Sequence, residues 1–249
     1  MKISIITVVL NGEKTISKAM ESVGNQLNCD IEHIVIDGGS SDATLSLLEK
    51  YKDQIAILVS GPDRGIYDAM NKGIRLATGD VIGFLNSDDV YMSNEVVSLV
   101  SRCLKEYDVD AVYGDLEYFL EASPAKVCRT YRSDRFSPNK LSMGLMPAHP
   151  TLFLRRQVYQ IFGLFDPSYR IGGDFEFIAR IFRDEKIRSH YIPKVMVRMQ
   201  LGGVSTSGLR STLLLLKENL RACKTNGIPT SYFKLLTRYP GKLLEFFNI

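Results

Sequence analysis

The stretch VIGFLNSDDVY, residues 81–91, changes from apolar to polar within a few positions. Its first five residues fit a buried strand, and that run ends at Asn86-Ser87-Asp88-Asp89. Aspartates are common in turns that cap a following helix. A carboxylate at a strand end can equally bind Mg²⁺ or Mn²⁺, hard cations that prefer oxygen ligands and share them with substrate phosphates. The stretch alone leaves both interpretations open.

The residues before it alternate between apolar runs and segments with helical spacing. Strands are predicted over 3–9, 31–36, 55–60 and 81–85, and helices over 16–23, from Asp42, over 66–79 and over 95–107. Unbroken apolar strands are typical of a parallel sheet covered on both faces. Ligands of such sheets bind beyond the carboxyl ends of the strands. Asn11, Asp37 and Asp88 each follow a strand, so we expect them along one edge.

The pattern changes after Tyr113. The sequence predicts a hairpin around Ser123-Pro124, a loop-rich segment over 132–151, a helix from Gly172 and a strand over 189–200. Helices with a different charge balance are predicted from Gly208 onward. We found no internal repeat.

Composition excludes several classes of protein. The 249 residues are 45% hydrophobic and 24% charged, and a chain of this length needs no disulfide to build a core. A formal net charge of +3 gives no reason to expect nucleic-acid binding. Four separated cysteines without zinc-site spacing indicate reduced thiols of a cytosolic protein. Neither a signal peptide nor an apolar stretch of about 20 residues is predicted.

Glycines surround several of the candidate charged residues. After Asp37, Gly38-Gly39 either forms a tight turn or lets the backbone approach a ligand. Arg64 beside a phosphate would make a charge-assisted contact, and Lys72 fits either such a site or a solvated helix face. Gly73 costs about 1 kcal/mol relative to alanine inside a helix, which predicts a packing or ligand reason for it.

Four motifs, in this order and spacing, resemble the family 2 inverting glycosyltransferases of GT-A fold. They are ISIITVVLNGEKTISKAMESV (3–23), IVIDGGSSDAT (34–44), PDRGIYDAMNKGI (62–74) and VIGFLNSDDV (81–90). Within that family, the chain resembles bacterial glycosyltransferases of colanic acid and exopolysaccharide biosynthesis. The match covers about residues 1–115, with weaker motifs to about 205.

The resemblance implies an α/β fold of GT-A type. It has a mostly parallel, Rossmann-like sheet with helices on both faces and a C-terminal helical extension. We accordingly expect a nucleotide-sugar-binding half over 1–115, an acceptor-binding and catalytic half of the same domain over 116–207, and a basic helical extension over 208–249.

The resemblance also implies a nucleotide-diphosphate sugar, a UDP- or GDP-sugar, at the carboxyl edge. The residues implied to contact its base and ribose are Val8, Asn11, Glu13, Asp37 and Asp63. His149, between two prolines, is either structural or close to the diphosphate or the acceptor.

The family's metal motif is Asp-x-Asp, and the matching triplet here is Asn86-Ser87-Asp88. Asp88 would therefore bind Mn²⁺ or Mg²⁺, while Asn86 could hydrogen-bond the ribose or a metal-bound water. A site with one carboxylate should hold the metal weakly without the nucleotide. Asp89 would be a supporting or capping neighbour.

An acidic motif at the start of a later helix supplies the family's catalytic base. RIGGDFEFIARIF, residues 170–182, matches it in kind, which makes Asp174 the implied base and Glu176 the reserve. Gly173 stands where the family more often has Glu. From position alone, Asp174 could equally be an N-cap or a first-turn acid favoured by the helix dipole.

The tail over 205–249 is basic. It holds seven Lys or Arg and two Glu, a charge of +5, which leaves −2 for the remainder of a chain that totals +3. Basic residues interleaved with Leu, Tyr and Phe predict either an interfacial helix on an anionic membrane or a packing helix with a solvated basic face.

Together these features predict a metal-dependent inverting glycosyltransferase that moves one sugar to an acceptor hydroxyl, on an oligosaccharide or lipid-linked sugar of surface polysaccharide synthesis. It would be cytoplasmic, free or peripheral on the inner face of the plasma membrane. Processive members carry Gln-x-x-Arg-Trp and membrane helices, whereas this chain has no Trp. The alternatives are an inactive nucleotide-sugar-binding subunit and a sugar-nucleotide nucleotidyltransferase. The latter requires a glycine-rich phosphate loop after the first strand, which VVLNGEKT does not supply.

Overall fold

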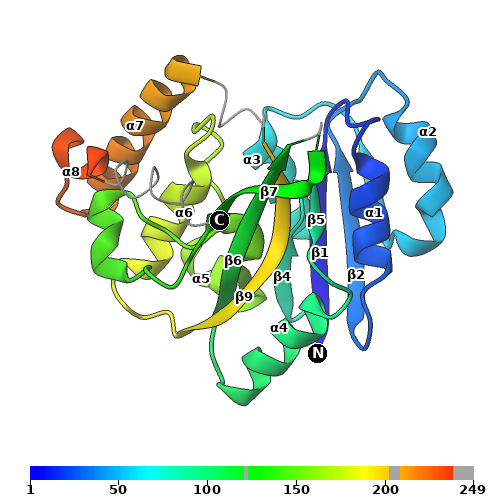
Figure 1. The fold of residues 1–249 in the computed structure, drawn as a ribbon, viewed down its shortest axis with the longest axis horizontal. Helices are drawn as coiled ribbons and strands as arrows, with labels where there is room; N and C mark the ends of the chain where they lie inside the picture. The colour runs from blue at the N-terminus through cyan, green and yellow to red at the C-terminus, as the bar shows by residue number, and fades with distance from the viewer. Residues whose placement is uncertain (121–122, 202–207, 238–249) are drawn as a thin grey trace.

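The structure is a computed structural model, and it describes all residues except 121–122, 202–207 and 238–249. The described residues form one mixed sheet with helices on both faces (Figure 1). Its strands are β1 (Lys2–Val9), β2 (Asp30–Asp37), β3 (Ile57–Ser60), β4 (Val81–Phe84), β5 (Asp89–Tyr91), β6 (Ala111–Leu120), β7 (Ser123–Tyr131), β8 (Phe153–Arg155) and β9 (Ser189–Gln200). The helices are α1 (Ile16–Gly24), α2 (Thr44–Leu48), α3 (Ile66–Leu76), α4 (Val96–Glu106), α5 (Arg156–Phe162), α6 (Gly173–Phe182), α7 (Gly208–Thr225) and α8 (Tyr232–Leu236), with 3-10 turns η1 (Glu49–Gln54), η2 (Pro138–Met143) and η3 (His149–Thr151).

The first half of the sheet is parallel, as predicted. Strands β3, β2, β1 and β4 lie side by side in that order, each pair parallel. Val9 of β1 pairs with Asp37 of β2, and Ile6 of β1 pairs with Phe84 of β4. The residues that follow these three strands therefore lie along the same carboxyl edge.

The second half of the sheet is mixed. Strand β8 is antiparallel to both β4 and β6, while β9 is parallel to β6 and antiparallel to β5. The predicted hairpin is present, because β6 and β7 pair antiparallel on either side of residues 121–122. Strands β5 and β8 and helix α5 were not predicted. Two of these are only three residues long, and their pairing depends on distant segments.

Strand β5 corrects the prediction of a capping turn at Asp89. That residue begins β5, opposite Met199 of β9, and its side chain is fully buried. Helix α4 begins only at Val96, after an N-cap residue, Glu95, whose side chain makes no cap hydrogen bond.

Successive side chains of the central strands pack on opposite faces of the sheet, in separate apolar clusters. On one face Ile6, Val8 and Phe84 pack beneath α3, α5, α6 and α7. On the other face Ile3 and Ile5 pack beneath α1 and α4. The alternation follows the two-residue period of a strand and explains why both faces of this sheet are apolar.

Gly73 serves packing of α3 on the sheet. A Cβ at Gly73 would lie 2.5 Å from Ile6 Cγ2, so the glycine lets α3 approach β1 closely. The packing reason is therefore sufficient, and no ligand needs to be invoked for this residue.

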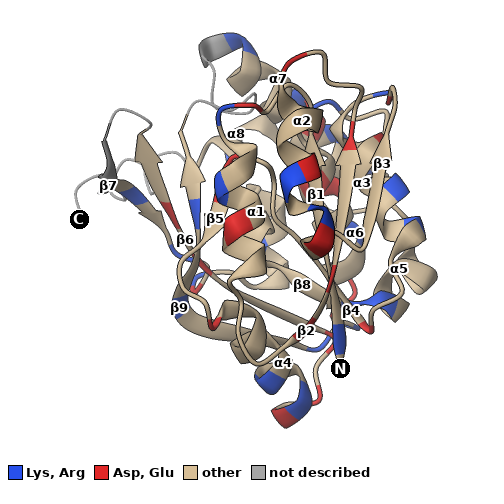
Figure 2. Ribbon diagram, turned by 90° about the vertical axis from the view of Figure 1, so that its right-hand side faces the viewer, with Lys and Arg blue, Asp and Glu red and all other residues tan. Residues whose placement is uncertain are grey.

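The described part of the C-terminal segment packs on the domain. Helix α7 contacts α6 and α8 contacts η2, at the opposite end of the molecule from α1 and α2 (Figure 1). Ala222, Cys223 and Leu235 are fully buried there. Charged residues lie mainly in the helices and the loops rather than within the central strands (Figure 2). Of the helices that the structure describes, none has the length and apolar composition to span a bilayer.

Candidate active site at the carboxyl edge of the sheet

The turns after β1 and β2 are joined by hydrogen bonds. Asn11, at a φ of 52°, donates its backbone N–H to Ser40 Oγ at 2.8 Å. Its Oδ1 accepts the Ser41 N–H at 2.9 Å. The Glu13 carboxylate accepts the Ala43 N–H at 3.1 Å. Asn11 and Glu13 thus lie at the predicted edge, where they hold the two turns together, and Val8 is buried just before them.

Asp37 ends β2 and is fully buried. Its carboxylate accepts the N–H groups of Gly39 and Ser40 at 3.1 Å and the Ser60 hydroxyl at 2.6 Å. These contacts fix the turn and tie it to the end of β3. Asp37 lies where the sequence predicts, and protein donors already occupy its oxygens.

The loop 61–65 lies beside that turn. Asp63 accepts the Gly65 N–H at 2.9 Å, and its other oxygen lies so close to Gly38 that a Cβ there would be 2.5 Å away. The Arg64 side chain is 79% exposed and contacts Asp68 at 3.1 Å. Lys72 Nζ donates to the Pro62 carbonyl at 2.9 Å, so it holds the loop on α3.

The end of β4 is different, because several of its oxygens lack partners. Asn86 Oδ1 and both carboxylate oxygens of Asp89 are buried without a hydrogen-bond partner among the described residues. Asp88 is partly buried, and burial raises its pKa. Burial raises the pKa of Asp89 well above its usual range, and the Asp88 charge adds to that increase, while the side chain and backbone of Asn86 lie close enough to oppose it. Unpartnered buried oxygens are what a cation or its bound ligand would satisfy.

The oxygens at 86–89 fit a hard divalent cation that a ligand helps to coordinate. Within the described ranges, no three His, Cys, Asp or Glu side chains gather into a metal-binding cluster. The donor set therefore consists of one partly exposed carboxylate, Asp88, with an amide oxygen nearby. Such a set needs further oxygens from a substrate.

A second group of polar residues converges at the start of α6. The Tyr67 hydroxyl, from α3, accepts the Gly173 N–H at 2.8 Å and lies 3.5 Å from Asp174 Oδ1, to which it can donate. The Phe175 N–H also donates to Asp174 Oδ1, at 2.8 Å. Burial raises the pKa of Asp174, although the nearby His149 and these hydrogen bonds oppose the shift.

His149 connects the two groups. Its ring stacks on Phe84, the last residue of β4, with centroids 5.7 Å apart, and meets Phe165 edge-on at 6.0 Å. Burial lowers the pKa of His149, while the Asp174 charge opposes that change. His149 thus lies between the end of β4 and the start of α6.

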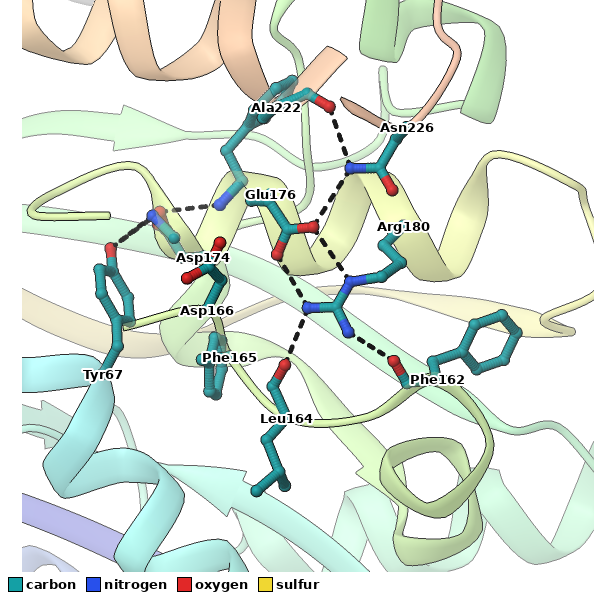
Figure 3. A network of polar contacts seen from close by, with 12 residues as sticks. Tyr67, Phe162, Leu164, Phe165, Asp166, Asp174, Glu176, Arg180, Ala222 and Asn226 are labelled. Carbon is teal, nitrogen blue, oxygen red and sulfur yellow. Dashed lines mark hydrogen bonds and ion pairs between the residues drawn. The ribbon is translucent and has the colours of Figure 1, made fainter. Parts of the chain in front are cut away.

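The reserve candidate, Glu176, is bound in a structural network (Figure 3). It is 4% exposed and accepts Arg180 Nη2 at 2.8 Å and Asn226 Nδ2 at 3.2 Å. Arg180 also donates to the carbonyls of Phe162 and Leu164. Figure 3 shows Asp174 on the side of the helix toward Tyr67, whereas Glu176 faces Arg180 and Asn226. The contacts therefore separate the two acids: Glu176 anchors α6 to its neighbours, and Asp174 faces the convergence at the sheet edge.

Sequence reasoning did not single out Tyr67. Its spacing on α3 matches that of core residues, and it is indeed 5% exposed. Only its hydroxyl, which reaches Asp174 from a helix more than a hundred residues earlier, gives it a place in the site. No sequence signal carries that contact.

Comparison with known proteins agrees with this architecture. Residues 4–160 match the family model described as Glycosyl transferase family 2. The PGL/p-HBAD biosynthesis glycosyltransferase of Mycobacterium bovis is 28% identical over 209 residues, which cover 82% of this chain and 79% of that protein.

Two solved structures are similar in fold. Staphylococcus aureus TarS 1–349 superposes with a TM-score of 0.69 at 17% identity, covering 96% of this chain and 72% of that one. The mannosyltransferase PcManGT from Pyrobaculum calidifontis, in complex with GDP-Man and Mn²⁺, has a TM-score of 0.65 at 17% identity, covering 90% of this chain and 67% of that one. Both likenesses concern the fold.

Proposed function

Because the chain belongs to glycosyl transferase family 2, we propose that it moves one sugar from a nucleotide-diphosphate sugar to an acceptor hydroxyl, with inversion at the anomeric carbon. The observation that carries this proposal is the convergence at the carboxyl edge. His149 lies between the end of β4, with its unpartnered oxygens, and Asp174 at the start of α6. A leaving group bound at the end of β4 and an acceptor bound at Asp174 would therefore lie on either side of His149.

The donor would be a UDP- or GDP-sugar bound over the joined turns. The groups proposed for the base and ribose are Val8, Asn11, Glu13 and Asp63, and Asp37 would support them through the hydrogen bonds that fix its turn. The exposed guanidinium of Arg64 is a cation that a diphosphate could reach, while Lys72 holds its loop. The GDP-Man and Mn²⁺ bound to the Pyrobaculum calidifontis mannosyltransferase, which has a similar fold, support this class of donor.

Asp88 would hold Mn²⁺ or Mg²⁺, with Asn86 orienting the ribose or a bound water. When bound, the ion neutralises negative charge on the leaving diphosphate. Since one carboxylate forms this site, the cation and the nucleotide should bind together rather than in sequence.

Asp174 is the proposed general base. Its carboxylate accepts the acceptor's hydroxyl proton as that oxygen bonds to the anomeric carbon, and the bond from this carbon to the diphosphate oxygen breaks on the opposite face. Tyr67 and the Phe175 N–H orient one carboxylate oxygen. A raised pKa makes the carboxylate a stronger base, and such help is typically worth about 10²–10⁴-fold, or about 3–5 kcal/mol.

The acceptor would be an oligosaccharide or lipid-linked sugar of surface polysaccharide synthesis. Helix α8 exposes Tyr232, Phe233 and Leu236 beside Lys234, an apolar and basic surface that fits the cytoplasmic face of an anionic membrane. Sedimentation with anionic vesicles should therefore exceed that with zwitterionic ones. Equal sedimentation with both would remove the membrane from the proposal.

A panel of UDP- and GDP-sugars, assayed with and without Mn²⁺, tests the proposed function. We expect Mn²⁺-dependent release of free sugar and nucleoside diphosphate from one donor, because water replaces a missing acceptor. With pyrophosphate added to the same panel, formation of a nucleoside triphosphate and a sugar 1-phosphate would instead indicate the nucleotidyltransferase. Binding without turnover, even with candidate acceptors, would indicate the inactive subunit.

A further inference from the structure

The loop before α6 is bound by a carboxylate from the C-terminal segment. Glu218 of α7 accepts the N–H of Arg170 at 2.9 Å through Oε1, and those of Ile171 and Gly172 at 3.0 and 2.7 Å through Oε2. The next N–H, of Gly173, donates to the Tyr67 hydroxyl. Four consecutive backbone donors that precede Asp174 are thus taken by two side chains from other elements.

Both glycines in this loop are needed for those contacts. A Cβ at Gly172 would lie 3.0 Å from Glu218 Cβ, and one at Gly173 would lie 2.7 Å from the Tyr67 ring. Glu218 is 7% exposed, so its charge is balanced mainly by the three N–H groups. The absence of side chains at Gly172 and Gly173 therefore lets Glu218 of α7 and Tyr67 of α3 hydrogen-bond the backbone directly before the proposed base.

We infer that Glu218 is the positioning residue of the catalytic centre. It fixes the orientation of Asp174 by holding the three residues that lead into it, and its negative charge occupies the N-terminal end of α6. Without that charge, the freed N–H groups would stabilise ionised Asp174 and make it a weaker base. The inference rests on the proposed function, since it concerns the same base.

A matched control exists at the opposite edge of the sheet. Glu32 is 5% exposed and likewise accepts several hydrogen bonds, from Ser4 Oγ at 2.6 Å, the Thr78 N–H at 2.8 Å and Lys2 Nζ at 2.7 Å. Both glutamates accept backbone hydrogen bonds, but only Glu218 holds the segment that directly precedes Asp174. Replacing each by Gln separates loss of stability from loss of chemistry.

The experiment compares Glu218→Gln, Glu218→Asp and Glu32→Gln in donor hydrolysis across pH, with thermal melting of each. Glu218→Gln should lower kcat by about 10- to 100-fold with an unchanged donor KM, since misplacement by about 1 Å can cost about 10²-fold. The acid limb of its pH profile should move to lower pH. The other titratable groups that face Asp174 are Tyr67 and His149, and all three variants keep both.

Glu32→Gln should lower the Tm while kcat and the pH profile stay as in the wild type. Glu218→Asp, which keeps the charge on a shorter side chain, should lower kcat without moving the acid limb, and it carries the test if Glu218→Gln fails to fold. A folded Glu218→Gln or Glu218→Asp variant with wild-type kcat would overturn the inference. An inactive wild type would instead overturn the proposed function.

A pocket that two residues of the same loop line supports a second inference. A cavity of about 300 Å³ opens there, lined by Arg170, Ile171, Arg210, Ser211 and Leu214. Arg180, Arg183 and Arg221 nearby each have a carboxylate partner, whereas neither Arg170 nor Arg210 has one among the described residues. Two guanidinium groups at one cavity favour an anion, and their planar donors match a phosphate ester.

We propose that this pocket binds a phosphate or diphosphate of the acceptor. One of its lining residues, Arg170, precedes Asp174 by four residues. With the donor site saturated by its nucleoside diphosphate, calorimetry should detect a second site for inorganic pyrophosphate. Combined Arg170→Ala and Arg210→Ala substitution should weaken it at least about tenfold, whereas Lys224→Ala, an exposed cation on the same helix, should not. Absence of the second site, or its survival in the double variant, would refute the proposal.

Discussion

Two strand ends on one edge of the sheet carry acidic residues that differ in their hydrogen-bond partners. At the end of β2, Asp37 accepts hydrogen bonds from two backbone N–H groups and a serine hydroxyl. Beyond β4, Asn86 Oδ1 and both Asp89 oxygens have no hydrogen-bond partner in the part of the chain that the structure describes. The first turn is complete in the protein alone, while the second lacks the partners that a ligand would bring.

The same contrast recurs within α6. Glu176 is paired with Arg180 and Asn226, whereas Asp174 lies near Tyr67 and His149, and burial raises its pKa. Sequence motifs do not distinguish the roles of these acidic residues, because each follows a strand or lies at the start of a helix. Their hydrogen-bond partners separate acids that hold the fold from acids that remain for chemistry.

The largest expected effect comes from Asp174→Asn. Loss of the base should reduce sugar transfer by about 10²–10⁴-fold while nucleotide-sugar binding persists, because the residues proposed to bind the donor lie elsewhere. Its matched control is Glu176→Gln on the same helix, which should lower the Tm but leave kcat near the wild-type value. Equal loss of transfer in both variants would erase the distinction between the two acids.

Asp88→Ala is expected to have the next largest effect. Without the carboxylate, Mn²⁺ should no longer strengthen nucleotide binding in calorimetry, and turnover should fall on the order of 10²–10³-fold, as when one group that stabilises developing negative charge is removed. Mn²⁺ enhancement that survives in this variant would show that the cation lies elsewhere.

Asp37→Ala should act mainly on stability. The N–H groups of Gly39 and Ser40 would lose their acceptor, and each lost hydrogen bond should lower the free energy of unfolding by about 1 kcal/mol and with it the urea midpoint. The comparison would fail if Asp37→Ala unfolded like the wild type, since the turn would then not depend on this carboxylate.

The smallest effect concerns the stability of Asp174→Asn as a function of pH. Because burial raises the folded-state pKa of Asp174, its ionised form lowers wild-type stability above that pKa, and this loss disappears below the unfolded value of about 3.9. The Asn variant should therefore melt at a higher temperature than the wild type near neutral pH, with the difference closing toward pH 4. A variant that is less stable at neutral pH would contradict the raised pKa.

The parallel half of the fold follows from local patterns in the sequence. Unbroken β-branched runs predict β1 and β2, and the polar residues after them do lie on one edge. Strands β5 and β8 were not predictable, because three residues carry no period and both form only by pairing with distant strands.

The candidate site divides in the same way. Motif order predicts Asp37, Asp88 and Asp174 as site residues, because each lies at the end or the start of a local element. Tyr67 and Glu218 act on the loop before Asp174 from helices far away in the chain, so their roles depend on tertiary packing. The C-terminal segment, predicted as a separate basic extension, supplies one of them. The sequence of the C-terminal segment reveals its basic charge, but it does not reveal that Glu218 on α7 is buried.

The most direct test of the central claim is the anomeric configuration of the transferred sugar, measured by proton NMR on the product formed from the donor that the panel identifies. A single base at Asp174 and attack opposite the diphosphate predict inversion relative to the donor. Retention of configuration would contradict a one-step displacement and, with it, the role assigned to Asp174.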